Sequence, residues 1–186
     1  MSDPTPTRNR RRTTAGSAVL KRLVLGAMLA ALSVVIGMIC KNFLNFAGGL
    51  LRITFENTPI ILAGVFLGPL TGGMVGILSD LISYLLSGQI YPPNLIVTLG
   101  ACAVGVVSGL MAKFVVRSHG KRQIILSAAA AHIIGSMIIK PIGLYQFYGW
   151  AVLIRIPLYL VIAPLEILLL CSLWNRAAFR RLFEKL

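Results

Sequence analysis

The chain has 186 residues, of which 57% are hydrophobic and only 12% are charged. A soluble domain carries about 25% charged residues, so this composition excludes a soluble enzyme or binding domain and indicates an integral membrane protein. The formal net charge of +13 is compatible with nucleic-acid binding. The basic residues lie mostly at the ends of apolar segments, however, so we interpret them as a topology signal and expect no nucleic-acid partner.

Apolar segments of membrane-spanning length predict six helices, near residues 20–40, 53–69, 71–88, 93–116, 122–147 and 150–174. The expected fold is therefore an all-α integral membrane protein, a six-transmembrane-helix bundle. In this topology all 18 Lys and Arg residues lie on one side of the membrane, except Lys41, Arg52, Lys140 and Arg155. The positive-inside rule then places both termini in the cytoplasm. We expect the protein to lie in the inner (plasma) membrane of a bacterium.

Three parts of the chain follow from this pattern: a disordered basic cytoplasmic tail (1–18), a six-helix membrane domain (19–175) and a basic cytoplasmic C-terminal tail (176–186). The apolar run from Leu23 to Cys40 has the length of a span, so we interpret it as a retained first helix rather than a cleaved signal peptide.

Motifs for catalysis and metal binding are missing from the sequence. The chain has no G-x-x-x-x-G-K-[ST] phosphate loop, no H-E-x-x-H and no G-x-S-x-G. Cys40, Cys102 and Cys171 form no metal-binding pattern and are expected to be small core residues. We therefore expect no enzyme activity, no ATP hydrolysis by this chain, no cofactor and no metal.

Four ionisable residues lie inside the apolar segments: Glu56, Asp80, Lys140 and Arg155. A charge at membrane depth costs roughly 2.5–3.5 kcal/mol on insertion scales, so such residues usually line a cavity or meet a partner. The topology places Glu56 within one turn of the outer end of the second helix and the other three in the outer or middle part of the bundle. They predict a pocket for a zwitterionic or polyanionic solute, with two internal salt bridges as the alternative.

Aromatic and amide residues surround these charges in the expected outer half. The candidate ligand-binding set, besides the four charged residues, is Asn57, Tyr84, Tyr91, Asn94, Tyr145 and Tyr159. An interfacial aromatic belt would account for many of the aromatic residues. Glu166 lies deeper in the membrane. There it would neutralise a charged residue of a neighbouring helix, join a buried hydrogen-bond network or contact a partner protein.

Small residues form a second pattern. Helices in membranes associate by close backbone approach, which small-x-x-x-small spacing permits. Gly64, Gly68, Gly72 and Gly76 have this spacing and are expected to pack helices inside the bundle. Ala27 and Ala31 have it in the first helix, where they would contact either a membrane partner or the interior of the bundle.

These features resemble the substrate-binding (S) components of energy-coupling factor (ECF) vitamin transporters, over about residues 20–175. The stretch from Arg52 to Ile60, the glycines Gly64, Gly68 and Gly73 ahead of Asp80, and Tyr91-Pro92-Pro93-Asn94 with Thr98-Leu99-Gly100-Ala101 are similar to the folate-family members. The resemblance implies a high-affinity binder of folate or a related vitamin. It also implies partners: a transmembrane coupling subunit, contacted through Ala27 and Ala31, and two cytoplasmic ATPase subunits.

Other functions remain open from the residues alone. The chain would alternatively be an S component for another vitamin or an ion-coupled small-solute carrier in which Asp80 and Glu56 titrate. A structural membrane protein without a ligand is a further alternative.

Overall fold

The structure, a computed structural model, describes residues 7–46, 51–87, 93–115 and 120–176. Side chains are described for 19–44, 53–87, 93–115, 120–154 and 156–176. Tyr91 and the side chain of Arg155 therefore lie outside the described residues, and the roles expected for them stay predictions.

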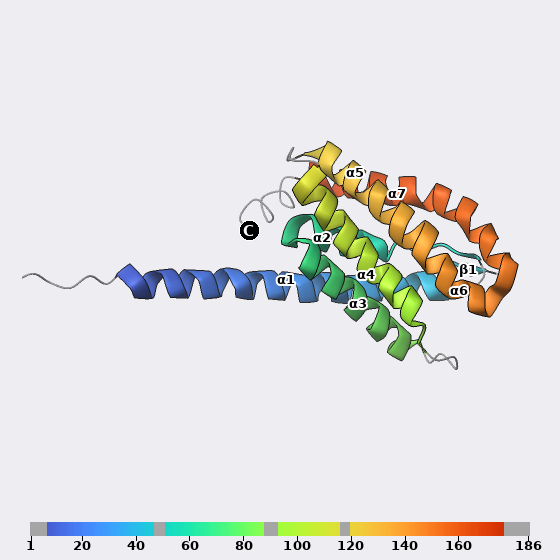
Figure 1. Cartoon of the computed structure of the whole chain (residues 1–186), viewed down its shortest axis with the longest axis horizontal. Coiled ribbons are helices and arrows are strands. Elements are labelled where there is room, and N and C mark those ends of the chain that lie inside the picture. The colour runs from blue at the N-terminus through green and yellow to red at the C-terminus, as the bar shows by residue number, and fades with distance from the viewer. Residues whose placement is uncertain (1–6, 47–50, 88–92, 116–119, 177–186) are drawn as a thin grey trace, which may run out of the picture.

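The described part of the chain is all-helical apart from one short strand pair (Figure 1). The elements in chain order are α1 (Thr7–Phe43), β1 (Asn45–Phe46), β2 (Leu51–Arg52), α2 (Asn57–Leu67), α3 (Pro69–Leu86), α4 (Leu95–Leu110), η2 (Met111–Val115), α5 (Lys121–Ala131), η3 (His132–Ile139), α6 (Lys140–Tyr148), η4 (Gly149–Ile154) and α7 (Arg155–Asn175). Strands β1 and β2 pair antiparallel, with Asn45 opposite Arg52.

Five helical segments are long and apolar enough to cross a membrane: Val19–Phe43, Pro69–Leu86, Leu95–Val115, Lys121–Ile154 and Ile156–Asn175. The segment Lys121–Ile154 is built from α5, η3, α6 and η4 in succession. Helix α2 (Asn57–Leu67) is a further apolar helix and is shorter than these five. The predicted fold class, an all-α membrane protein with six helices, is confirmed.

Helix α1 is much longer than the bundle requires. It contains 37 residues, which gives about 55 Å at 1.5 Å per residue, and its N-terminal part projects beyond the other helices (Figure 1). The helix begins at Thr7, inside the segment 1–18 for which we expected disorder. No proline follows Pro6 before the apolar run, so nothing in the sequence stops the helix from extending back to Thr7.

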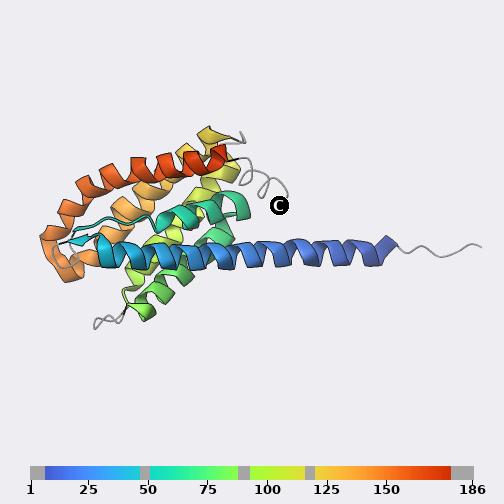
Figure 2. The same cartoon turned by 180° about the vertical axis from the view of Figure 1, so that it is seen from behind.

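The start of the second helix differs from the prediction. Residues Ile53–Phe55 are not helical, and α2 begins at Asn57 rather than near residue 53. Pro59 explains the difference, because a proline is tolerated in the first helical turn but would break the hydrogen-bond ladder of a helix begun at residue 53. The segment before α2 runs from the strand pair into the bundle (Figure 2), and Glu56 at its end accepts a hydrogen bond from Ser33 of α1.

Close backbone contact joins α2, α3 and α4. A Cβ atom added at Gly76 would collide with the Ala101 carbonyl of α4, and one at Gly105 would collide with the backbone of Gly72 in α3. A Cβ atom added at Gly64 of α2 would collide with the Gly105 carbonyl and the Ser108 hydroxyl of α4. Gly64, Gly72 and Gly76 therefore pack helices inside the bundle, as the spacing predicted. For Gly68 the prediction was wrong: it has φ 102° in the turn between α2 and α3, and a Cβ atom there would meet nothing within 4 Å.

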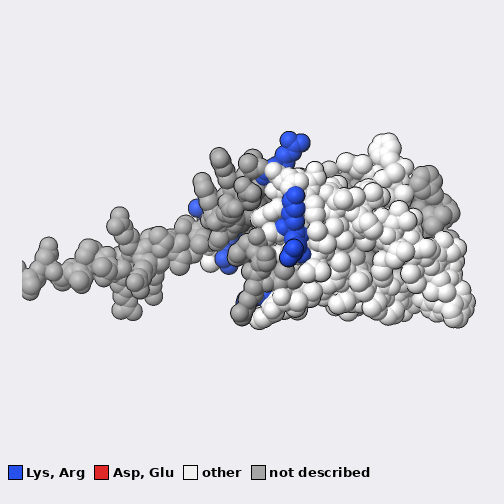
Figure 3. All heavy atoms as spheres, turned by 90° about the horizontal axis from the view of Figure 1, so that it is seen from above, with Lys and Arg blue, Asp and Glu red and all other residues white. Residues whose placement is uncertain are grey.

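Exposed basic side chains gather at one end of the bundle (Figure 3). The exposed Lys and Arg residues with described side chains are Lys21, Arg22, Lys113, Lys121, Arg122 and Arg176. They lie on α1 or at the ends of η2, α5 and α7 that meet there. The positive-inside rule predicts that this end faces the cytoplasm.

Candidate functional site

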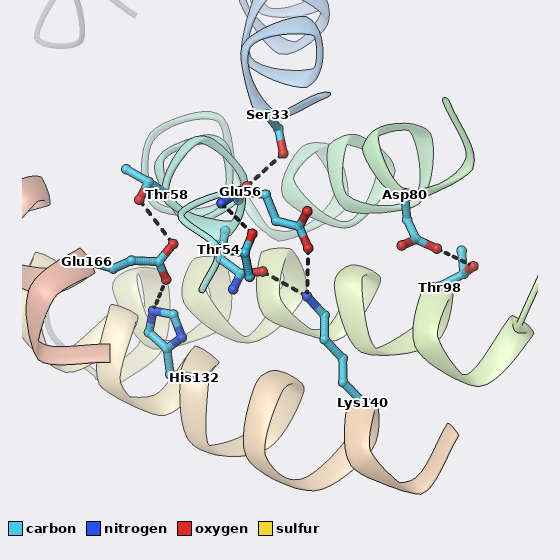
Figure 4. Close-up of polar contacts among 10 residues, drawn as sticks. Ser33, Thr54, Glu56, Thr58, Asp80, Thr98, His132, Lys140 and Glu166 are labelled. Carbon is cyan, nitrogen blue, oxygen red and sulfur yellow. Dashed lines mark hydrogen bonds and ion pairs between the residues drawn. The ribbon is translucent and has the colours of Figure 1, made fainter. Parts of the chain in front are cut away.

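Lys140 is the centre of a buried charged cluster. It is the first residue of α6, it is 5% exposed, and its Nζ donates to Asn57 Oδ1 at 3.0 Å (Figure 4). The same Nζ lies 3.7 Å from Glu56 Oε1. Segments more than 80 residues apart in the sequence thus meet at one ammonium group. We call Glu56, Asn57 and Lys140 the Lys140 cluster.

Two glycines make room for this cluster. A Cβ atom at Gly37 of α1 would lie 2.8 Å from Glu56 Oε2, and one at Gly100 of α4 would lie 2.7 Å from Lys140 Cγ. The Ser33 hydroxyl donates to the Glu56 carbonyl at 2.7 Å, and the Thr54 hydroxyl accepts from the Glu56 backbone N–H at 3.3 Å. The position of Glu56 is therefore fixed by α1 and by the segment before α2.

Asn57 has spare hydrogen-bonding capacity. Its side chain is fully buried, and its Nδ2 has no hydrogen-bond partner among the described residues. An unpaired buried donor costs about 1–3 kcal/mol. The Asn57 side chain is therefore a donor that the described part of the protein leaves unused.

Asp80 lies on α3 and is half-buried. Its Oδ2 accepts from the Thr98 hydroxyl of α4 at 2.6 Å, which leaves Oδ1 without a hydrogen bond from the described residues. Among the described residues, Lys140, Glu56 and Lys41 are close enough to interact with its carboxylate electrostatically. Asp80 and the Lys140 cluster therefore share one electrostatic environment, while each carboxylate keeps a separate partner.

The remaining candidate residues are placed in different ways. Tyr84 is half-buried one turn after Asp80, and Tyr159 of α7 is 5% exposed. Tyr145 is 48% exposed and contacts Trp150 edge to face, with ring centroids 5.8 Å apart, as a residue of an interfacial belt would. Asn94 caps α4 by accepting from the Ile96 and Val97 N–H groups, and its Nδ2 donates to the Gly143 carbonyl at 2.6 Å. Asn94 therefore has a structural role that joins α4 to α6.

Glu166 belongs to a second buried cluster. It is fully buried on α7, its Oε2 lies 2.8 Å from His132 Nε2, and its Oε1 accepts from the Thr58 hydroxyl at 3.3 Å (Figure 4). His132, the first residue of η3, is also fully buried. Of the alternatives considered for Glu166, the structure shows that it faces a neighbouring helix and joins a buried polar network.

Ala27 and Ala31 lie on the exposed face of α1. The same face carries Val24, Met28, Leu32, Val35 and Ile39, all exposed, whereas Ala30, Ser33 and Val34 on the opposite side are buried. Packing against the described part of the bundle is therefore not the role of the Ala27-x-x-x-Ala31 pattern.

Comparison with known proteins identifies the family. The sequence model of the family described as "ECF transporter, substrate-specific component" matches residues 21–182. The chain belongs to this family. It is accordingly a multi-pass protein of the cell membrane, a non-enzymatic binding component that works with the ECF module.

Two solved structures share this fold. One, described as FolT bound with folic acid, has a TM-score of 0.65 and 23% identity, over 84% of this chain and 92% of that one. Another, described as the S component of a bacterial ECF transporter, has a TM-score of 0.61 and 23% identity, over 85% of this chain and 95% of that one. Comparison with curated protein sequences gives no match.

Several residues that contact the candidate site residues or lie near them were not among the sequence candidates. Thr98 binds Asp80, Ser33 and Thr54 position Glu56, and Lys41 donates to the Ser83 carbonyl at 3.2 Å and to Ser87 Oγ. Hydroxyl groups within apolar helices carry a weak signal, because many bond only to their own helix, as Ser79 does to Val75. Their partners became evident only from the packing of the helices.

Proposed function

We propose that this S component binds folate, or a related vitamin with a pterin ring and carboxylate groups. The observation that carries the proposal is the pairing inside the bundle: Glu56 and the Asn57 amide hold Lys140, while Asp80 has Thr98 as its hydrogen-bond partner among the described residues. One carboxylate thus balances the buried cation, and the other keeps an oxygen for a ligand. The likeness of the fold to FolT bound with folic acid supports this choice of vitamin.

The chemistry of a folate fits these groups. A pterin presents a donor-rich 2-amino-4-oxo edge that a carboxylate accepts in bidentate fashion. Asp80 is the acceptor that we propose for this edge. The Asn57 N–H and Lys140 would meet acceptor oxygens of the ligand, Arg155 would meet its glutamate tail, and Tyr84, Tyr91 or Tyr159 would stack on its rings.

Transport would follow from reorientation of the loaded protein against a partner. We propose that Ala27 and Ala31 contact the transmembrane coupling subunit, because their small size allows another helix to approach α1 closely. Two cytoplasmic ATPase subunits would supply the energy.

Replacing Asp80 by Asn tests the recognition of the pterin edge. The amide keeps the shape of the carboxylate, but an NH2 donor replaces one of its two acceptor oxygens and would face a donor of the pterin, so affinity for folate should fall more than affinity for its 2-des-amino analogue. We expect the difference between the two losses to be about 1–3 kcal/mol. Calorimetry with both compounds on the purified variant measures it.

Glu56→Gln is the matched control for that measurement. Because Glu56 balances Lys140, its amide variant should lose affinity for the two compounds to the same degree. Equal losses in the Asp80→Asn protein would show that Asp80 does not recognise the amino group.

A further inference from the structure

The first turn of α2 is where the two buried clusters meet. Asn57 and Thr58 are consecutive residues, yet their side chains bond to different helices: Asn57 accepts from Lys140 of α6, and Thr58 donates to Glu166 of α7. Both residues are buried, at 0% and 3% exposure. A displacement of Thr58 would therefore displace Asn57.

The contacts close a circuit through the bundle (Figure 4). Glu166 faces His132 at the start of η3, and Lys140 follows directly after the last residue of η3. From Lys140 the circuit returns to Asn57 and thus to Thr58. Segment η3 is a π-helix, a form that is rare and often found at functional sites.

Few local interactions hold the first turn of α2, among them the bond from the Thr58 N–H to the Phe55 carbonyl at 3.2 Å. Its N-cap residue Glu56 makes no side-chain capping bond, and Pro59 contributes no backbone N–H. The turn is positioned instead by side chains from other helices: Ser33 of α1, Lys140 of α6 and Glu166 of α7.

We propose that Thr58, Glu166 and His132 form a positioning network that sets the place of Asn57, and through it the geometry of the ligand site. None of the three needs to contact the ligand. The network also links the ligand site to α7. The proposal rests on the proposed function, since it assumes that the Lys140 cluster contacts the ligand.

The test uses the full chain in detergent, with folate as the probe. Valine has the shape of threonine without its hydroxyl, so Thr58→Val removes the bond to Glu166 and should weaken folate binding about 5- to 50-fold. Thr58→Ser keeps the hydroxyl and should bind within about threefold of wild type. Ser127→Ala is the matched control, because Ser127 Oγ is buried without a hydrogen-bond partner in the described residues, and its affinity should not change.

A double-mutant cycle separates positioning from general destabilisation. If Thr58 acts through Asn57, Thr58→Val should cost less than about threefold in an Asn57→Ala background. Full additivity would overturn the proposal, and so would a Thr58→Val protein that melts earlier but binds folate like wild type. If Thr58→Val does not fold, Glu166→Gln replaces it in the test. This variant changes the carboxylate that faces His132, and we expect the same loss of folate affinity and the same non-additivity with Asn57→Ala.

A ligand-free measurement keeps this proposal separate from the choice of vitamin. Hydrogen–deuterium exchange at residues 57–62 should be faster in Thr58→Val than in wild type and unchanged in Ser127→Ala. If wild type fails to bind folate but this exchange pattern holds, the vitamin is wrong and the positioning network stands. Equal exchange in all three proteins would overturn the network.

Discussion

Replacing Lys140 by Met is expected to weaken folate binding by about 2–5 kcal/mol, the range for removing one partner of a desolvated charge pair. Methionine has a similar length but no charge, so Glu56 Oε1 and Asn57 Oδ1 lose their contact with the Lys140 ammonium group. Calorimetry on the folded variant gives the affinity, and thermal denaturation without ligand gives the stability.

The double variant Glu56→Gln/Lys140→Met serves as the control for that result. Removing one member of a buried pair strands the other charge, whereas neutralising both is often tolerated. The double variant should therefore recover stability relative to Lys140→Met without recovering affinity. If both stability and affinity returned, Lys140 would be a partner of Glu56 only, as in the salt-bridge alternative.

Ala27→Trp and Ala31→Trp are expected to abolish ATP-driven uptake while leaving ligand affinity unchanged. Both positions are exposed in the chain, so a larger side chain does not disturb the bundle but keeps a partner helix away from α1. Uptake by cells or proteoliposomes containing the ECF module, compared with calorimetry on the S component alone, measures the two effects.

Leu160→Trp provides the comparison on another helix. Leu160 is 66% exposed and lies on α7, so a tryptophan there adds the same bulk to the surface without changing the exposed face of α1. Uptake should persist in Leu160→Trp. Normal uptake by the two alanine variants would remove this face of α1 from the proposed contact with the coupling subunit.

Composition and periodicity were enough to predict the fold class, because 57% hydrophobic residues in 186 leave room for about six spans and little else. Helix packing at Gly64, Gly72 and Gly76 was also predicted, since small-residue spacing in membrane helices usually marks positions of close helix contact. The start of α2 was not predicted. A hydropathy window does not distinguish extended apolar residues from helical ones, and the position of Pro59 carried the missing signal.

The candidate site was predicted by residue type but not by pairing. Glu56, Asp80 and Lys140 were selected as candidates because a charge inside an apolar segment costs free energy in the membrane and is usually paired or functional. Which carboxylate balances Lys140 depends on the rotation and depth of three helices, which the sequence does not fix. The partner of His132 was missed for the same reason, since Glu166 lies 34 residues away on another helix.

The measurement that tests the central claim most directly is calorimetry of folate binding to the purified full chain. Mass spectrometry of any small molecule that copurifies accompanies it. The account predicts saturable high-affinity binding of folate at one site and a folate-class compound in the copurified material. Absence of folate binding by folded protein, with a vitamin lacking a pterin ring in the copurified material, would contradict it.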